Sequence, residues 1–452
     1  MANEPFMDRW TLNGTEVLLQ DHGRDQANGV PVLNNEAKLP LSYMPQNYAS
    51  WLKVSPEDPN EDSFADWLVK LNSELFRNRG KVWTQSTQTN ASIRGLAYGN
   101  GLFVAGGAGS SAKGIYWSED GMHWTQVSGM DVVVTSVAFI NNLWLALTSG
   151  SGLYWSENGK TWTQAVSSGT FQFPACYNNF WVCGTSGKGV YWSEDGKTWT
   201  QSTGEGSFTS YTMQYPVYAD GLWVVSSGAN QGMWWSENGK EWHKGTGTMG
   251  QSSMTMGRAI KQNGIWVVGA TNTKGVHWSE DGKTWNYSNL STSASTTAES
   301  LTYANNVFVI YVVSPTHMLC ISADGKTWTT ISAVSNNIRE IIYANGIFVA
   351  MPITGTVWYS ENGTNWFACN GCSGTTSYSG CLMFANGIWI AVFNANTYIS
   401  ENGKNWSIAS GLPSGGENLQ LVCYGNGVWV RGSNGAGLWY SQSKDLWLPE
   451  TE

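Results

Sequence analysis

The sequence predicts an all-β protein: a β-propeller of about nine four-stranded blades, preceded by a small N-terminal region with extended segments and one helix. Three observations lead to this prediction. A short hairpin motif recurs nine times, its tryptophans lie 37 to 43 residues apart, and a second hairpin signal precedes most copies. A fixed period of this length is typical of repeat folds, and four short strands per repeat with aromatic signatures are typical of propeller blades.

The recurring motif, here called the tryptophan hairpin, is an aromatic strand, Ser-Glu-Asp/Asn-Gly-Lys and a tryptophan, as from Tyr116 to Trp124. The last copy, around Ser441, is degraded. Because one blade cannot bury both faces of its sheet, we expect the tryptophans to pack between blades and the Asp or Asn to cap the turn. The residues with these expected structural roles are Asp120, Trp124, Asn158, Trp162, Asp195, Trp199, Asn238, Trp242, Asp281, Trp285, Asp324, Trp328, Asn362, Trp366, Asn402 and Trp406.

The second hairpin signal is an Asn-Gly or Asp-Gly pair between apolar runs, as at Asn100-Gly101 and Asp220-Gly221. Both residues tolerate the positive φ of a type I′ turn, so this pair predicts the turn between the first two strands of each blade. The tryptophan hairpin then supplies the third and fourth strands.

Ring closure is predicted from a mismatch in the strand count. The chain holds nine sets of first-to-third strands but ten fourth-strand segments, because Val82-Trp83-Thr84-Gln85 matches Trp199-Thr200-Gln201. We therefore expect the segment around Trp83 to complete the last blade and close the ring without a covalent bond.

The predicted domains are an N-terminal region, residues 1–80, and the propeller, residues 81–452. Within the first, Asn13-Gly14 predicts a short hairpin between residues 10 and 20. Apolar residues from Phe64 to Leu75 recur at helical spacing and predict a helix over about 62–79.

Composition limits the possible functions. The net charge of −9 and the absence of any Lys/Arg-rich run argue against nucleic-acid binding. The seven cysteines lack the spacing of a disulfide framework, and most are expected to be small buried apolar residues. Cys369 and Cys372 have metal-type spacing, but no second pair and no nearby histidine accompanies them. No cofactor or metal is predicted. The N-terminus has no signal-peptide pattern, and no stretch is apolar enough to insert into a membrane, so synthesis in the cytoplasm is expected.

The tryptophan hairpin resembles the Asp-box, or BNR repeat, of sialidases, sortilin-type receptors and many bacterial and phage propellers. The resemblance covers residues 81 to about 450 and implies the propeller fold, but little about chemistry, because these families share little of it. The turn is one residue shorter here, since the glycine directly follows Asp or Asn. Asn replaces Asp in four copies, which fits a structural role and not a metal or catalytic one.

Residues 27–45 resemble a segment found in bacteriophage tail-fibre and virion-appendage proteins. The matching positions are Gly29, Leu33, Lys38, Leu39, Pro40 and Pro45; Asn34, Ala37 and Met44 depart from the pattern. The resemblance implies a virion location, with the N-terminal region docking on other tail or capsid proteins. An extended Pro-punctuated linker is the plainer interpretation. Such appendages are often trimeric, and a homo-oligomer stays open although no heptad pattern is visible.

A sialidase-like enzyme would need a specific set of residues at the propeller centre. Sialidases hold a substrate carboxylate with three arginines at the propeller centre. Three of the four arginines after residue 81 (Arg94, Arg258 and Arg339) lie at or within one residue of the same repeat position. No Tyr/Glu nucleophile pair and no Arg-Ile-Pro segment is present, so no catalytic residue is assigned and the protein is predicted not to be an enzyme.

Binding is predicted on the face opposite the two turn types, where loops vary in length and content. The innermost-strand position also varies. Its candidate ligand-facing residues, with the neighbouring Arg258, are Arg94, Gln172, Gln214, Arg258, Glu299, Arg339 and Gln420. A rigid scaffold with adaptable polar loops is typical of a recognition surface. The predicted function is host-surface glycan or protein recognition by a phage virion appendage. The alternatives are a structural virion protein and a sialidase-like glycoside hydrolase.

Overall fold

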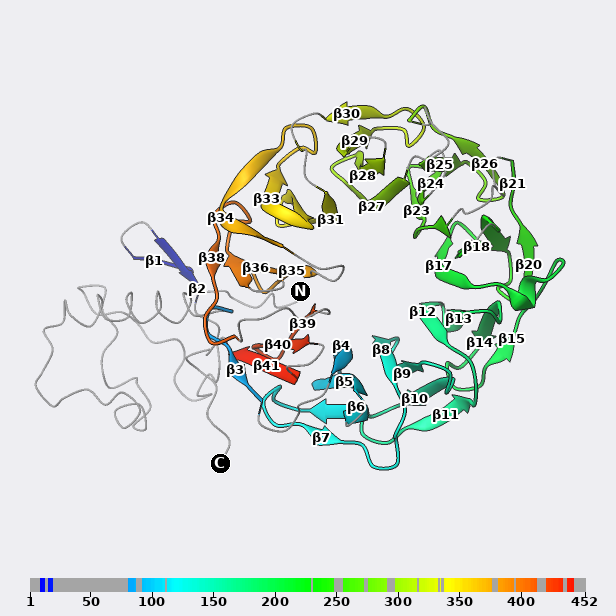
Figure 1. The fold of residues 1–452 in the computed structure, drawn as a ribbon, viewed down its shortest axis with the longest axis horizontal. Helices are drawn as coiled ribbons and strands as arrows, with labels where there is room; N and C mark the ends of the chain where they lie inside the picture. Colours follow the sequence, from blue (N-terminus) through cyan, green and yellow to red (C-terminus); the bar gives the residue numbers. More distant parts are fainter. Residues whose placement is uncertain are drawn as a thin grey trace, which may run out of the picture. The chain divides into compact units, whose positions relative to one another are not determined.

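The computed structural model shows a propeller of nine blades, in which the first strand of each blade lies nearest the ring axis and the fourth strand lies at the periphery (Figure 1). The chain divides into two units, residues 1–70 and 71–452. The structure describes residues 9–12, 15–18 and 80–442. Within the last range, 87–91, 110–111, 229–230, 248–254, 272–274, 291–296, 315–316, 332–333, 335–336, 376–380, 394–395, 413–419 and 434–436 are not described.

The first unit contains one described hairpin. Strand β1 (Arg9–Leu12) pairs antiparallel with β2 (Thr15–Leu18), in register from Arg9 with Leu18 to Leu12 with Thr15. This pairing confirms the hairpin predicted around Asn13-Gly14. The predicted helix over 62–79 and the segment from Gly29 to Pro45 lie outside the described residues.

Blades 1 to 5 are antiparallel sheets in chain order. Their strands are β4 (Ile93–Gly99), β5 (Leu102–Gly109), β6 (Ala112–Ser118) and β7 (Thr125–Gln126); β8 (Val134–Ile140), β9 (Leu143–Thr148), β10 (Leu153–Ser156) and β11 (Thr163–Val166); β12 (Phe171–Tyr177), β13 (Phe180–Thr185), β14 (Val190–Ser193) and β15 (Thr200–Gln201); β17 (Met213–Ala219), β18 (Leu222–Ser227), β19 (Met233–Ser236) and β20 (Glu241–Lys244); and β22 (Thr255–Met256) with β23 (Ile260–Gln262), β24 (Ile265–Thr271), β25 (Val276–Ser279) and β26 (Thr284–Tyr287).

Blades 6 to 9 follow the same plan. Their strands are β27 (Thr297–Ala304), β28 (Val307–Ser314), β29 (Met318–Ser322) and β30 (Thr329–Ile331); β31 (Ile338–Ala344), β32 (Ile347–Pro352), β33 (Thr354–Ser360) and β34 (Phe367–Thr375); β35 (Cys381–Ala385), β36 (Ile388–Val392), β37 (Thr397–Ser400) and β38 (Ser407–Ile408); and β39 (Gln420–Gly425), β40 (Val428–Ser433), β41 (Gly437–Gln442) and β3 (Thr84–Gln85). Among the described residues the only helical element is the short 3-10 turn η2 (Phe208–Ser210).

Blade 9 is completed by the start of the propeller, as the strand count predicts. Thr84 and Gln85 of β3 pair with Tyr440 and Trp439 of β41, and the amide of Ser86 donates to the carbonyl of Leu438 at 2.9 Å. Trp83 serves as the tryptophan of this blade, because its Nε1 donates to the Gly80 carbonyl at 2.8 Å, just as Trp124 donates to Gly121. The ring is therefore closed by pairing between the two ends of the propeller.

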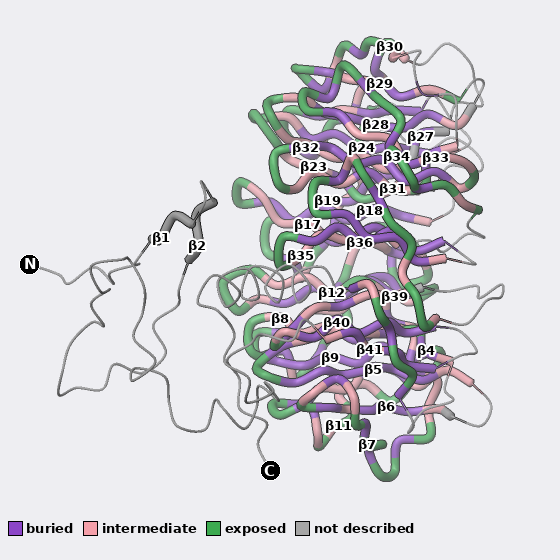
Figure 2. The backbone as a smooth tube through the Cα atoms, turned by 90° about the vertical axis from the view of Figure 1, so that its left-hand side faces the viewer, coloured by how far each residue is buried: buried purple, intermediate pink, exposed green. Residues whose placement is uncertain are grey.

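The hydrophobic core is divided into nine clusters, and each lies between two neighbouring blades. Every tryptophan-hairpin Trp that the structure describes belongs to the cluster shared with the preceding blade; Trp285, for example, packs with Leu222 and Val224 of blade 4. This arrangement confirms the predicted packing between blades. Figure 2 shows the result: buried residues run along the strands and exposed residues gather at the turns.

Neighbouring blades are also joined by backbone hydrogen bonds at the periphery. Two short strands that leave a fourth strand, β16 (Thr203–Gly204) and β21 (Thr246–Gly247), pair in parallel with the fourth strand of the next blade, β20 and β26. Single parallel bridges join Asn370 to Asn405 and Val82 to Ser410 in the same way. Each link satisfies part of an otherwise open sheet edge.

Candidate functional site

The two faces of the ring differ in how uniform they are. The turn face carries the first-to-second and third-to-fourth turns of every blade. The loop face carries the second-to-third loops and the connections between blades. The side chains of the turns determine whether the turn face is scaffold or site.

The first-to-second turns all use two residues in the left-handed region, as the Asn-Gly signal predicts. Asn100 and Gly101 have φ of 49° and 74°. Blades 2, 3 and 6 achieve the same geometry with Asn-Asn, as at Asn141-Asn142 with φ of 48° and 61°. Asparagine accepts this conformation more readily than most residues, so the turn is kept without glycine.

The tryptophan-hairpin turn is held by one carboxyl or amide oxygen. In blade 3, Asp195 Oδ1 accepts hydrogen bonds from the Ser193 hydroxyl at 2.9 Å and from the amides of Lys197 and Thr198 at 2.8 and 2.7 Å. Asn238 Oδ1 accepts the equivalent three bonds in blade 4. The exchange of Asp for Asn therefore leaves the turn intact, as the structural interpretation of these residues requires.

The charge of the aspartates still affects stability, and its sign can be derived. Burial would raise the pKa of Asp195, Asp281 and Asp324, but hydrogen bonds from two backbone amides and from the Ser and Thr hydroxyls outweigh it and lower the pKa. A lowered folded-state pKa adds stability above the unfolded value of about 3.9, and this contribution is lost as the pH falls through the folded value.

Replacing Asp195, Asp281 and Asp324 together with asparagine should therefore weaken the acid sensitivity of the fold. At pH 7 the triple variant should stay close to the wild type in melting temperature, because Asn supports this turn elsewhere in the ring. Between about pH 5 and 2 it should lose less stability than the wild type. Melting temperatures measured by circular dichroism across this range test the expectation, and parallel pH profiles for the two proteins would contradict it.

The Glu and Lys of the motif form a ladder around the turn face that sequence reasoning missed. The Nζ of Lys240 lies 2.7 Å from Oε1 of Glu194 in the preceding blade and 4.2 Å from the centroid of a Trp192 ring. Equivalent Lys–Glu pairs are Lys160–Glu119, Lys197–Glu157, Lys283–Glu237, Lys326–Glu280 and Lys404–Glu361. Each lysine also lies over an aromatic ring of the preceding blade.

A compensating change in the sequence could have revealed this ladder. Blade 7 has Thr364 where most copies have Lys, and the preceding blade has Ala323 where most copies have Glu. Both partners are thus missing from the same interface. An unpaired charge at this position would gain nothing, so the joint loss fits a pairwise interaction between neighbouring repeats.

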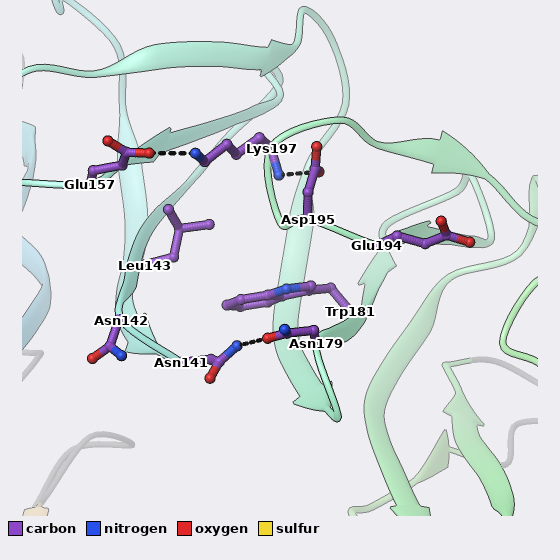
Figure 3. Close-up of a pocket in the computed structure, with 9 residues that line it drawn as sticks. All are labelled: Asn141, Asn142, Leu143, Glu157, Asn179, Trp181, Glu194, Asp195 and Lys197. Atoms are coloured by element: carbon purple, nitrogen blue, oxygen red, sulfur yellow. Dashed lines mark hydrogen bonds and ion pairs between the residues drawn. The ribbon is translucent and has the colours of Figure 1, made fainter.

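A pocket on the turn face lies between blades 2 and 3 (Figure 3). Its lining includes members of the ladder and of the turns, and these are already bonded to one another. Lys197 pairs with Glu157, and Asn141 donates to Asn179. The pocket is therefore a seam between two blades, and its polar groups serve the scaffold.

The predicted ligand-facing residues lie on the innermost strands. Arg94 on β4 and Arg339 on β31 are exposed, and Arg258 is exposed between β22 and β23. Gln172 and Gln214 are half-buried and meet across two blades, with Gln214 Nε2 donating to Gln172 Oε1 at 2.8 Å. The side chains of Glu299 and Gln420 lie outside the described part of the chain. The arginines belong to blades 1, 5 and 7, so no two of them come from adjacent blades.

The innermost strands are bulged at this position, which the sequence did not reveal. In blades 1, 2 and 7 the pairing register skips Arg94, Thr135 and Arg339. A β-bulge leaves its residue outside the regular pairing of the two strands and changes the direction of its side chain. Six of the described first strands thus depart from regular pairing at the variable position or directly after it.

In blades 3 and 4 the bulge falls one residue later, on an aromatic residue. The register skips Phe173 between Gln172 and Pro174, and it skips Tyr215 and Pro216 between Gln214 and Val217. Proline has no amide hydrogen to donate to the neighbouring strand, and this favours a bulge at this point. The repeated aromatic-Pro pair in adjacent repeats was the signal that would have identified these two residues.

The histidines and cysteines show no sign of a metal site in the residues that the structure describes, where no group of three or more His, Cys, Asp or Glu lies close enough to hold an ion. His277 is buried, and burial lowers its pKa to about 4. Cys369 and Cys372 are buried free thiols, and burial raises the pKa of Cys369 to about 12. In the same residues, no helix is long and apolar enough to cross a membrane.

No protein-family model and no curated protein sequence matches this chain. The similar solved structures include the computationally designed Ika8 protein, with 12% identity, a TM-score of 0.50, and coverage of 80% of this chain and 100% of Ika8. YCF48 from Cyanidioschyzon merolae has 10% identity and a TM-score of 0.44 over 81% and 100% of the two chains. The GH74 enzyme of Niastella koreensis has 15% identity and a TM-score of 0.38 over 80% and 62%.

The fold and its neighbours define the class of this protein as a nine-bladed β-propeller with four-stranded blades. At these identities the likeness extends to the fold alone. The resemblances to Asp-box repeats and to phage tail-fibre segments stay predictions.

Proposed function

We propose that this chain is a recognition protein of a bacteriophage virion appendage. Its propeller binds a host-surface glycan or protein on the loop face, near the ring axis, where the first strands begin. The observation that carries the recognition role is the contrast between the two faces. On the turn face, side chains pair with neighbouring repeats. At the start of the first strands, the bulged positions carry different residues from blade to blade, and Arg94, Phe173 and Arg339 among them are exposed.

The charge distribution also favours a binding site near the ring axis on the loop face. The chain has a net charge of −9, yet three of the four arginines in the propeller lie at these axial positions. Arginine offers five donors in a planar fork and suits polar recognition. The virion part of the proposal rests on the resemblance of residues 27–45 to tail-fibre proteins, which implies docking to the particle through the N-terminal region.

A non-catalytic role is proposed as well. The exposed arginines come from blades 1, 5 and 7, whereas a sialidase-like site needs three guanidinium groups around one carboxylate. The carboxyl group next to Arg339 is not free, because Glu340 Oε2 accepts a hydrogen bond from the amide of Leu382 at 2.8 Å. A glycosidase assay of the wild type and of Arg339→Ala tests the hydrolase alternative.

Adsorption of the full-length protein to a panel of bacterial strains tests the recognition role. The double variant Arg94→Ser/Arg339→Ser should adsorb more weakly than the wild type. Its charge-matched control is Lys160→Ser/Lys240→Ser, which removes two positive charges from the turn face and should adsorb like the wild type. Equal loss in both double variants would point to a non-specific charge effect, and a wild type that adsorbs to no strain would contradict the proposed function.

A further inference from the structure

We propose that Phe173 and Tyr215 form a platform on which the pyranose ring of a glycan stacks. The inference rests on the proposed function and assigns its ligand class and contact residues. It concerns the start of the first strands of blades 3 and 4, where both aromatic residues occupy the bulges described above.

The two rings form one aromatic surface across neighbouring blades. Their centroids are 4.0 Å apart and their planes are inclined by 31°. Phe173 is 43% exposed, although it lies on an innermost strand, and Tyr215 is half-buried against it. Aromatic surfaces of this kind present a flat apolar face to a ligand, and the apolar C–H face of a sugar ring is complementary to it.

The backbone beneath both rings is strained. Phe173 has φ of 50° and Tyr215 has φ of 52°, in the left-handed region that bulky residues avoid. Both precede a proline, which disfavours helical conformations of the residue before it. Strain of this type is unfavourable and gathers at functional sites.

The blade fold does not require this strain. Arg94, Thr135 and Arg339 occupy the bulges of blades 1, 2 and 7 without a positive φ. Blade 6 takes the left-handed bulge as well, but with the small residue Ser300 at φ of 53°. Blades 3 and 4 instead use large aromatic residues for it, in two adjacent repeats whose rings meet.

Polar groups suited to sugar hydroxyls lie beside the platform. The linked amides of Gln172 and Gln214 directly precede the two rings in sequence and join the same two strands. Burial raises the pKa of Tyr215. The positive charge of Arg339, which lies three blades away, opposes that rise. A flat apolar surface edged by amide groups matches a ring with one apolar face and a hydroxylated rim.

The size of the exposed apolar area favours a glycan over a protein partner. Among the described residues, the large exposed hydrophobic side chains on the innermost strands are Phe173 and Tyr177; Val82, Phe367 and Ile408 lie with the outermost strands. A stable protein interface buries roughly 800 Å² on each partner and has an aromatic, desolvated centre. One two-ring platform is the size of a sugar contact.

The test compares full-length wild type with Phe173→Asn on an array of bacterial surface oligosaccharides and polysaccharides. Asparagine accepts a positive φ, so this change removes the ring and relieves the strain together. Binding to the recognised glycans should fall by about tenfold or more. The melting temperature should stay level or rise. Tyr215→Asn should show the same loss of glycan binding and the same melting behaviour. This second variant excludes an effect that is specific to position 173.

Phe367→Asn is the matched control. Phe367 on β34 is 54% exposed and is also paired with a tyrosine ring, Tyr359, at 5.6 Å between centroids, but it lies on an outermost strand. This variant should bind glycans like the wild type.

Three results would overturn the inference, and they separate it from the proposed function. Glycan binding unchanged in both Phe173→Asn and Tyr215→Asn would reject the platform and leave the recognition role intact. Adsorption to cells without any glycan binding, abolished by protease treatment of the cells, would indicate a protein receptor. A wild type that adsorbs to no strain and binds no glycan would reject the proposed function and the platform with it.

Discussion

Replacing Trp83 with alanine is expected to lower the free energy of unfolding of the propeller by about 3–5 kcal/mol, the usual cost of truncating a buried tryptophan. Trp83 is 2% exposed and packs with Ile388, Ile390 and Trp429 in the cluster between blades 8 and 9. The strand that follows it pairs through only Thr84 and Gln85. The indole is therefore the large buried side chain of the closing segment, and its loss leaves a cavity at the joint.

Trp162→Ala is the control for this prediction. Trp162 is the equivalent residue of blade 2, where the chain is continuous, and it is half-buried rather than buried. Its truncation should cost less and should leave closure untouched. Urea unfolding followed by circular dichroism compares the two variants, and an equal loss in both would show that Trp83 has no special part in closing the ring.

Gly282→Ala is expected to destabilise the propeller clearly more than Gly264→Ala, although both glycines end tight turns of blade 5. Their φ angles are 71° and 75°, so both variants should lose about 1–2 kcal/mol from the left-handed backbone. The two differ in their surroundings. A Cβ on Gly282 would lie 2.6 Å from Leu222 Cδ2 and 3.0 Å from Trp266 Nε1, whereas a Cβ on Gly264 would meet nothing within 4 Å.

The extra cost of Gly282→Ala should be about 1–3 kcal/mol, because overpacking a filled core forces neighbouring side chains out of position. Melting temperatures of the two variants, measured side by side, give the comparison without any further control. Equal melting temperatures would show that the interface between blades 4 and 5 can expand to accept a methyl group.

The fold could be predicted from sequence because its signals are local and repeated. The Asn-Gly pairs act through the φ of two residues, and the tryptophan hairpin acts through one oxygen and three donors within six residues. Nine imperfect copies of the same local pattern all indicate the same blade structure. Even the closure of the ring followed from counting fourth strands, because an unpaired strand edge at Trp83 had to be satisfied somewhere.

The candidate site was less predictable because it depends on interactions between repeats. The position of Arg94, Arg258 and Arg339 near the ring axis followed from their repeat register. The displacement of the bulge to Phe173 and Tyr215 did not, because it depends on how each first strand pairs with the second. The Lys–Glu ladder was also missed, since its partners lie about 40 residues apart and meet only once the blades are side by side.

The sequence by itself thus determined the blade, its turns, a blade count of about nine and the residues that close the ring. Each of these is specified within one repeat or by counting repeats. The tertiary structure alone decided which side chains of different blades meet: the lysines with the preceding glutamates, Gln172 with Gln214, and Phe173 with Tyr215. The physical reason is distance along the chain. Hydrogen bonding and backbone preference act between near neighbours in sequence, whereas contacts between blades depend on the packing of the closed ring.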